Sequence, residues 1–343
     1  MHDTTAPTTG APTFDVRLAA HEIADALADD VRRGLSTAPK SLPPKWFYDE
    51  RGSRLFDAIT RLPEYYPTEA EREILLARAA EIVDAAGADT VVELGSGTSD
   101  KTRALLDAAT EAGSLERFVP FDVSEATLRD AAAQLGDRYP GLRIHGVVGD
   151  FDHHLDALPR DGRRLVLFLG GTIGNFTPAG RRRLLDQLCG ELQPGDTLLL
   201  GTDLVKPASR LIPAYDDAAG VTAEFNRNVL HVINRELDAD FAPERFEHEA
   251  RWNSDAAWVE MHLVAKRPER VRIAKLDMEV TFAAGESIHT EISAKFRRDQ
   301  VTDELARVGM ATMAQWTDEA GEFAVTLAKR TEPARPSAPA PAR

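Results

Sequence analysis

The sequence is short of cysteine, of apolar runs and of basic residues, and each shortage excludes a class of protein. Cys189 is the single cysteine among 343 residues, which excludes an internal disulfide and is typical of a reducing cytosol. No apolar run is long enough to span a bilayer, and the Thr-, Pro- and Ala-rich beginning lacks the basic-then-apolar order of a signal peptide. We therefore expect a cytoplasmic protein without a membrane partner.

The shortage of basic residues excludes a second group of partners. Lysine and arginine number 41 against 56 acidic residues, and the formal net charge is −15. Phosphate contacts need clustered Lys and Arg, so this balance argues against DNA, RNA or an acidic membrane surface. We expect a monomer that binds a small molecule.

From residue 71 onward, short apolar runs rich in β-branched residues alternate with amphipathic helical stretches. The runs are apolar on both faces, as in a parallel sheet that helices cover on each side. The expected strands are 90–94, 117–123, 143–148, 165–170 and 197–201, and the helices include 101–112, 126–135 and 179–192. The alternation predicts an α/β fold with a doubly wound, mostly parallel, Rossmann-like sheet.

After residue 203 this alternation stops. A helical stretch at 209–237 is followed by runs with period-2 alternation, such as 259–264 and 278–282, which are typical of antiparallel strands. A helix at 299–308 and a terminal hairpin at 311–328 then complete the α/β pattern. We therefore predict an α/β domain at 71–205 and 295–330, an α+β domain at 14–70 and 206–294, and disordered tails at 1–13 and 331–343.

A glycine-rich turn follows the first of these strands. The segment 93–99 (ELGSGTS) opens into a helix, so its glycines allow close approach to a ligand whose anionic group the helix N-terminus favours. A dinucleotide loop needs a third glycine where this chain has Asp100, which argues against a nicotinamide-dependent dehydrogenase. The turn instead resembles the first motif of class I methyltransferases, which bind S-adenosylmethionine. A purely structural turn is the alternative.

Polar residues at the ends of the next strands fit the same ligand. Asp122 ends the second strand, where a carboxylate can accept both ribose hydroxyls, and 150–151 follows the third, where adenine binds. Lys101 is unfavourable for the helix dipole, so it is a candidate partner for the carboxylate of the cofactor. Either aspartate could instead cap a helix. The predicted cofactor site consists of Gly95, Ser96, Lys101, Asp122, Asp150 and Phe151.

Longer motifs carry a more specific resemblance. The segments 43–49 (PPKWFYD), 62–68 (LPEYYPT), 168–175 (FLGGTIGN) and 225–228 (FNRN), together with the glycine turn, resemble the L-histidine Nα-methyltransferase family of ergothioneine biosynthesis. The similarity covers residues 17–330. It implies a methyltransferase domain and a substrate-binding domain, S-adenosylmethionine as methyl donor without a metal, and trimethylation of the α-amino group of L-histidine to hercynine, the first step of ergothioneine biosynthesis.

The resemblance also implies which residues hold the substrate. The family places an amide like that of Asn175 on the amino-acid end of the substrate, and tyrosines like Tyr65 and Tyr215 on its carboxylate. Without the resemblance, these tyrosines would be read as half-buried core residues. The predicted pocket residues are Tyr48, Phe56, Tyr65, Gly170, Asn175, Tyr215, Thr222, Met261, Glu291 and Ser293.

Selectivity for the side chain is expected from segment 290–296 (TEISAKF). In a strand, Glu291 and Ser293 point to one face, which places a carboxylate and a hydroxyl side by side for the two nitrogens of an imidazole. A solvent-facing polar edge is the alternative. The chain departs from the family wording at Gly171 and Ala294, and neither change removes a predicted ligand.

The catalytic residues expected from this reading are Asn175, which fixes the lone pair of the amine, and Tyr48, which shares with water the role of proton carrier. His153 and His154 are adjacent and point apart, so no metal site is expected from them. Other readings are a methyltransferase for another small amine or amino acid, such as tryptophan, and a non-catalytic nucleotide-binding module.

Overall fold

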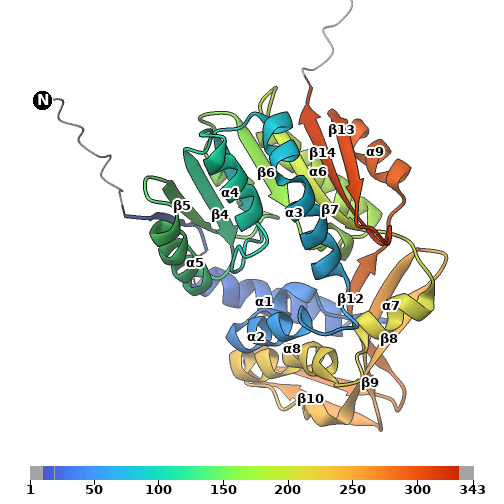
Figure 1. The fold of residues 1–343 in the computed structure, drawn as a ribbon. Coiled ribbons are helices and arrows are strands. Elements are labelled where there is room, and N and C mark those ends of the chain that lie inside the picture. The colour runs from blue at the N-terminus through green and yellow to red at the C-terminus, as the bar shows by residue number, and fades with distance from the viewer. Residues whose placement is uncertain (1–10, 19, 332–343) are drawn as a thin grey trace, which may run out of the picture.

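The computed structural model describes residues 11–18 and 20–331, which form two parts built on separate sheets (Figure 1). Helices cover a large sheet in the upper part of the view, and a small sheet packs with helices from both halves of the chain in the lower part. None of the helices in the described ranges is long and apolar enough to cross a membrane.

The large sheet is parallel except that β14 runs antiparallel to both of its neighbours, β7 and β13. In spatial order it consists of β1 (Thr13–Val16), β5 (Arg143–Val148), β4 (Arg117–Asp122), β3 (Thr90–Leu94), β6 (Arg164–Phe168), β7 (Thr197–Asp203), β14 (Phe323–Arg330) and β13 (Met310–Thr317). The strand order reverses direction at β3, as in a doubly wound sheet. The predicted α/β class is confirmed.

Both faces of the large sheet are covered, which explains why its strands are apolar throughout. Val91 points into one apolar core and its neighbour Val92 into another. The first core includes residues of α3 (Pro67–Ala86), α4 (Arg103–Glu111) and α5 (Glu125–Arg138), and the second includes residues of α6 (Pro178–Glu191) and α9 (Arg298–Arg307).

The small sheet has its own apolar core, which it shares with the helices packed on it. In spatial order it consists of β2 (Lys40–Ser41), β12 (Ser287–Ala294), β9 (Trp258–Ala265) and β8 (Phe246–Asn253), and β10 (Glu269–Ile273) pairs separately with β11 (Met278–Phe282). Its helices are α1 (Ala20–Leu35), α2 (Glu50–Ile59), α7 (Ala208–Tyr215) and α8 (Val221–Leu237). Although far apart in sequence, α2 and α8 lie side by side (Figure 1).

Short 3₁₀ helices connect these elements. They are η1 (Pro44–Phe47), η2 (Leu155–Ala157), η3 (Thr172–Asn175), η4 (Pro243–Arg245) and η5 (Ala274–Leu276). Two of them, η1 and η3, lead directly into the site described below.

The beginning of the chain differs from the prediction. Residue 13 was expected in a tail and 14–70 in the α+β domain, but β1 pairs in parallel with β5 at the edge of the large sheet. Gly146 makes this possible, because a side chain there would collide with the ring of Phe14. Residues 1–10 and 332–343 of the predicted tails lie outside the described residues. The remaining domain boundaries stay a prediction.

The predicted helix at 209–237 is wrong in its continuity. It is divided into α7 and α8 by a turn at 216–220. The Asp217 carboxylate accepts hydrogen bonds from the backbone N–H groups of Val221 (3.0 Å) and Thr222 (2.7 Å), and Gly220 has a φ of +75° that favours glycine. The break sets the end of α7, and with it Tyr215, beside the small sheet.

Candidate active site

A cavity lies where the carboxyl end of the large sheet meets the small sheet. Residues of the large part, including Gly170 and Asn175, line it together with residues of the small part, including Glu291 and Ser293. All the predicted pocket residues line this one cavity: Tyr48, Phe56, Tyr65, Gly170, Asn175, Tyr215, Thr222, Met261, Glu291 and Ser293. We call it the substrate pocket. The structure brings these residues together, and their individual roles remain predictions.

One wall of the substrate pocket is aromatic. The ring centroids of Tyr48 and Phe56 are 5.6 Å apart, those of Phe56 and Tyr65 are 6.3 Å apart, and those of Tyr65 and Tyr215 are 6.3 Å apart. Burial raises the pKa of Tyr48 and of Tyr65 well above the usual range, so both are neutral phenols. Rings in this arrangement can attract an ammonium group while their hydroxyls donate hydrogen bonds.

The segment 225–228 holds this wall in place through the side chain of Asn228. Asn228 donates from Nδ2 to the carbonyl of Phe47 (3.0 Å) and to the carboxylate of Asp49 (2.7 Å), on either side of Tyr48. Asp49 in turn caps α2 by accepting from the N–H of Gly52 (2.8 Å). The motif that carried part of the resemblance therefore positions Tyr48, and only its Phe225 lines the pocket itself.

At the opposite wall, Asn175 donates from Nδ2 to Oε1 of Glu291 at 3.0 Å. The contact depends on Gly174, because a side chain there would lie 3.0 Å from the carbonyl oxygen of Ala294 on β12. Burial raises the pKa of Glu291 to about 7, against the opposing effects of Lys295 and Asn175. A carboxyl group that titrates near neutrality and faces a cavity is a typical ligand-binding group.

Behind Glu291 lies a lysine that the sequence analysis missed. The Lys295 side chain is fully buried, and its Nζ donates to Tyr215 Oη (2.7 Å) and Ser293 Oγ (2.8 Å). The Tyr215 and Ser293 hydroxyls are also within 2.7 Å of each other. Burial lowers the pKa of Lys295, and the neighbouring Asp203 opposes that shift. Because side chains alternate between the two faces of a strand, Lys295 falls on the same face as Ser293 in segment 290–296. This pattern could have indicated that Lys295 lies near the pocket.

Asp203, at the end of β7, joins the two parts of the chain. Its carboxylate forms an ion pair with Lys295 (2.8 Å) and another with Lys206, and Tyr66 Oη donates to it at 2.8 Å. Its backbone carbonyl accepts from the N–H of Phe296 at 2.8 Å. Burial alone raises the pKa of Asp203, but the two lysines lower it below the usual range. The group is therefore a fixed anion between two cations.

The glycine turn forms the second half of the site. Gly95 and Gly97 have φ values of +68° and +49°, and a Cβ at either would point into space free of other described atoms within 4 Å. Among the described residues, the buried hydroxyl of Ser96 and one carboxylate oxygen of Glu93 have no hydrogen-bond partner. Burial raises the pKa of Glu93 to about 7. An open cradle beside unsatisfied polar atoms fits a bound polar ligand.

Of the other predicted cofactor residues, Asp122 contacts this cradle, and Asp150 and Phe151 follow the neighbouring strand β5. Asp122, at the end of β4, accepts hydrogen bonds from the N–H groups of Gly97 and Ser124 (both 3.0 Å), one on each carboxylate oxygen. Burial raises the pKa of Asp122. Asp150 accepts from the N–H of Asp152 (2.9 Å) in the turn after β5, and Phe151 packs against Phe168 with ring centroids 5.6 Å apart.

Lys101 has a protein partner that was not foreseen. Its Nζ donates to Glu71 at 2.8 Å, and Glu71, which is fully buried on α3, also accepts from the N–H of Gly170 at 2.8 Å. Gly201 makes room for this carboxylate, since a Cβ there would lie 2.2 Å from it. The side chain of Lys101 remains partly exposed, so a contact with the cofactor stays a prediction. The position of Glu71 in the site could not be predicted from the sequence, because its partners Lys101 and Gly170 are distant along the chain.

The chain matches, over residues 27–330, the protein family described as "Histidine-specific methyltransferase, SAM-dependent". It is 61% identical to the histidine N-alpha-methyltransferase of Mycolicibacterium smegmatis, with 91% of this chain and 98% of that protein aligned. It is 59% identical to the protein of the same name from Mycobacterium tuberculosis, over 89% of this chain and 95% of that protein. It is 32% identical to ergothioneine biosynthesis protein 1 of Schizosaccharomyces pombe, over 74% of this chain and 34% of that longer protein.

Proposed function

The chain belongs to the family of histidine-specific, S-adenosylmethionine-dependent methyltransferases, and from this we propose that it trimethylates the α-amino group of L-histidine to hercynine, the first step of ergothioneine biosynthesis. The names of its bacterial relatives support histidine as substrate, and the name of its yeast relative supports the pathway. The observation that carries the proposal is the placement of Glu291 and Ser293 in one pocket with Asn175 and the aromatic wall.

Glu291 and Ser293 suit the imidazole of the substrate. A carboxylate accepts from one ring N–H, and a hydroxyl can accept from or donate to the other nitrogen. Lys295 donates to Ser293 Oγ, and Tyr215 Oη lies 2.7 Å from the same oxygen. With Tyr215 as the donor of this pair, the Ser293 hydroxyl keeps its own proton for an outside acceptor such as an unprotonated ring nitrogen. We therefore propose that the ring N–H donates to Glu291 and that the unprotonated ring nitrogen accepts from the Ser293 hydroxyl.

The amino-acid end of histidine would then face Asn175 and the tyrosines. Tyr65 can donate to the carboxylate, and the positive charge of Lys295 beneath Tyr215 favours an anion beside Tyr215. Asn175 offers both a donor and an acceptor, so it can hold the amine through its oxygen while its nitrogen donates to Glu291. These contacts orient the lone pair of the amine toward the glycine turn.

Asp122, the glycine turn and the residues after β5 would hold S-adenosylmethionine, which would supply a methyl group on a positively charged sulfur. The protein therefore contributes mainly orientation, which can lower a barrier by about 7–11 kcal/mol in ideal cases. An α-amino group is largely protonated at neutral pH, so a proton must leave before each transfer. Because burial keeps Tyr48 protonated, we assign it the role of relaying this proton to water, and the aromatic wall stabilises the ammonium products.

Mass spectrometry of L-histidine incubated with the protein and S-adenosylmethionine tests the proposal. We expect products heavier by one, two and three methyl groups, with the trimethylated form accumulating. A parallel panel should include tryptophan and histamine, which lack an imidazole or a carboxylate respectively. Faster transfer to tryptophan than to histidine, or no transfer to any amino acid, would overturn the assignment.

A further inference from the structure

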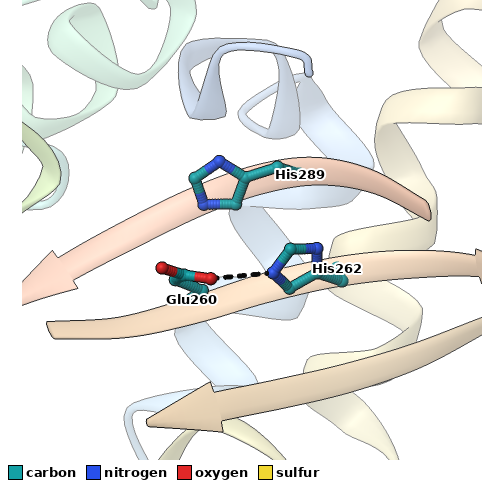
Figure 2. A group of neighbouring side chains, drawn as sticks. All are labelled: Glu260, His262 and His289. Atoms are coloured by element: carbon teal, nitrogen blue, oxygen red, sulfur yellow. Dashed lines mark hydrogen bonds and ion pairs between the residues drawn. The ribbon is translucent and has the colours of Figure 1, made fainter. Parts of the chain in front are cut away.

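A second cluster of ionisable side chains lies on the other face of the β9–β12 pair. Glu260 and His262 flank Met261 on β9, so they point away from the substrate pocket that Met261 lines. His289, on β12, is opposite His262, and the two imidazoles stack with centroids 5.0 Å apart (Figure 2). We call Glu260, His262 and His289 the histidine cluster.

A bulge in β12 creates this arrangement. His289 pairs with His262 and Glu291 pairs with Met261, so two steps along β12 correspond to one step along β9. The extra residue is Thr290. Without the bulge, His289 and Glu291 would share a face; with it, one lies in the histidine cluster and the other in the substrate pocket.

Each side chain of the cluster presents one atom to the other two. The three candidate ligand atoms lie within 4.8 Å of one another. Glu260 Oε2 and His262 Nε2 are 3.1 Å apart, and His289 Nε2 is buried without a hydrogen-bond partner among the described residues. An unpaired buried imidazole nitrogen beside a carboxylate and a second imidazole is costly unless something binds between them.

The atoms on the outer side of the cluster are already held by other residues. Glu260 Oε1 accepts from Trp258 Nε1 (2.7 Å) and from Asn253 Nδ2 (3.0 Å). His262 Nδ1 lies 3.3 Å from the hydroxyl of Ser287, which can accept from Nδ1–H when Nε2 gives up its hydrogen bond to Glu260 and binds a metal. Partners of this kind orient metal-binding carboxylates and imidazoles in proteins.

We propose that Glu260, His262 and His289 form a binding site for a divalent transition metal, with zinc as the expected ion. Two imidazole nitrogens and one carboxylate oxygen are a common zinc ligand set, with a fourth position left to water. The histidine cluster lies close to solvent, because the side chains of Glu260 and His289 are only partly buried. His289 is distant in sequence from Glu260 and His262, so the three residues carry no local metal-binding pattern.

The charges around the cluster are compatible with a cation. Arg251 is opposite Glu260 on β8, but its guanidinium is paired with Glu249 at 2.9 Å. A bound ion would tie β9 to β12 at the bulge, one residue from Glu291.

The test measures metal binding itself, on the full chain without a polyhistidine tag. After treatment with chelator, the protein is titrated with Zn²⁺ by calorimetry and with Co²⁺ by visible absorption, which reports the coordination geometry. We expect one ion per chain, tetrahedral Co²⁺ bands, and a rise in the melting temperature with Zn²⁺.

His289→Gln and Glu260→Gln should each weaken Zn²⁺ binding at least tenfold and abolish the Co²⁺ bands. Glu260→Gln keeps an acceptor for Trp258 and Asn253, so it is the variant that best preserves the fold. The matched control is His231→Gln, which removes an exposed histidine on α8 and should leave binding unchanged. Absence of Zn²⁺ binding by the wild-type chain, or equal binding by both cluster variants, would overturn the proposal.

Discussion

Glu260 and Glu291 lie on neighbouring strands of the small sheet and face opposite sides of it. Burial raises the pKa of Glu291 to about 7. Burial also acts on Glu260, but hydrogen bonds from Trp258 and Asn253 outweigh it and lower its pKa to about 2. The same residue type is thus tuned to accept a proton near neutrality in the substrate pocket and to stay ionised on the opposite face.

The difference comes from the number of donors that each carboxylate receives. Asn175 is the hydrogen-bond donor recorded for Glu291, which leaves acceptor capacity for a substrate. Glu260 receives hydrogen bonds from two neutral donors besides its contact with His262. A buried carboxylate short of donors can therefore exchange protons or hydrogen bonds with a substrate, whereas one with its donors in place is a fixed negative charge, as a metal ligand must be.

The largest expected effect comes from removing the buried positive charge of Lys295, which lies beneath the substrate pocket. Lys295→Met deprives Asp203 of one of its two lysines, so the free energy of unfolding should fall by about 3–5 kcal/mol, as for other broken buried ion pairs. Urea denaturation followed by circular dichroism measures this loss. The double variant Asp203→Asn/Lys295→Met removes both charges and should recover part of it. Strict additivity of the two single losses would contradict a coupled pair.

The next effect concerns the pocket carboxylate itself. Glu291→Gln keeps the shape and loses the charge, so kcat/KM for histidine should fall by about 10- to 100-fold, the range of a hydrogen bond to a charged group. Affinity for S-adenosylmethionine, measured by calorimetry, should not change. Glu247→Gln, on the exposed face of β8, is the matched control. Equal kcat/KM in the wild type and Glu291→Gln would remove Glu291 from substrate recognition.

A smaller effect is expected in the pH dependence of stability. The folded pKa of Glu291 is about 7 and the unfolded value about 4.5, so between these values the unfolded chain releases a proton that the folded chain keeps. The contribution of Glu291 to stability therefore falls as pH rises from 4.5 to 7. Glu291→Gln lacks this loss, so its melting temperature relative to wild type should rise over that window. A constant difference in melting temperature between Glu291→Gln and the wild type from pH 4.5 to 7 would contradict the raised pKa of Glu291.

The smallest expected effect concerns Glu260, on the opposite face of the small sheet, and its pH dependence has the opposite sign to that of Glu291. The folded pKa of Glu260 is about 2, below its unfolded value of about 4.5, so its contribution is complete above pH 4.5 and is lost as pH falls toward 2. In the presence of chelator, Glu260→Gln should cost about 1 kcal/mol or less at pH 7. Chemical denaturation at several pH values should show the difference from wild type shrinking in acid. A difference in the free energy of unfolding that grows as the pH falls would contradict the lowered pKa of Glu260.

The sequence predicted the large sheet well because its signal is local. The expected strands at 90–94 and 143–148 coincide with β3 and β5, where apolar runs are bounded by clear turns. It failed at β1, a four-residue strand whose pairing depends on space left at Gly146, and at the turn before α8, which depends on the Asp217 cap.

The site was predictable to the extent that a family motif supplied it. The substrate pocket residues came from the resemblance, and the structure places them around one cavity. Lys295, Glu71 and the histidine cluster were missed, because their meaning depends on partners far away in sequence or on the bulge at Thr290. Periodicity assigns side chains to faces only while the register is regular.

The junction at Asp203 has a consequence for protein engineering. This residue ends β7, pairs with Lys295 and accepts a backbone hydrogen bond from Phe296, so the floor of the substrate pocket is fastened to the sheet that carries the glycine turn. To change which amino acid is methylated, one can substitute the pocket-lining residues Glu291, Ser293 and Met261. The Asp203 junction should be kept, because it sets the distance over which any new substrate must meet the methyl donor.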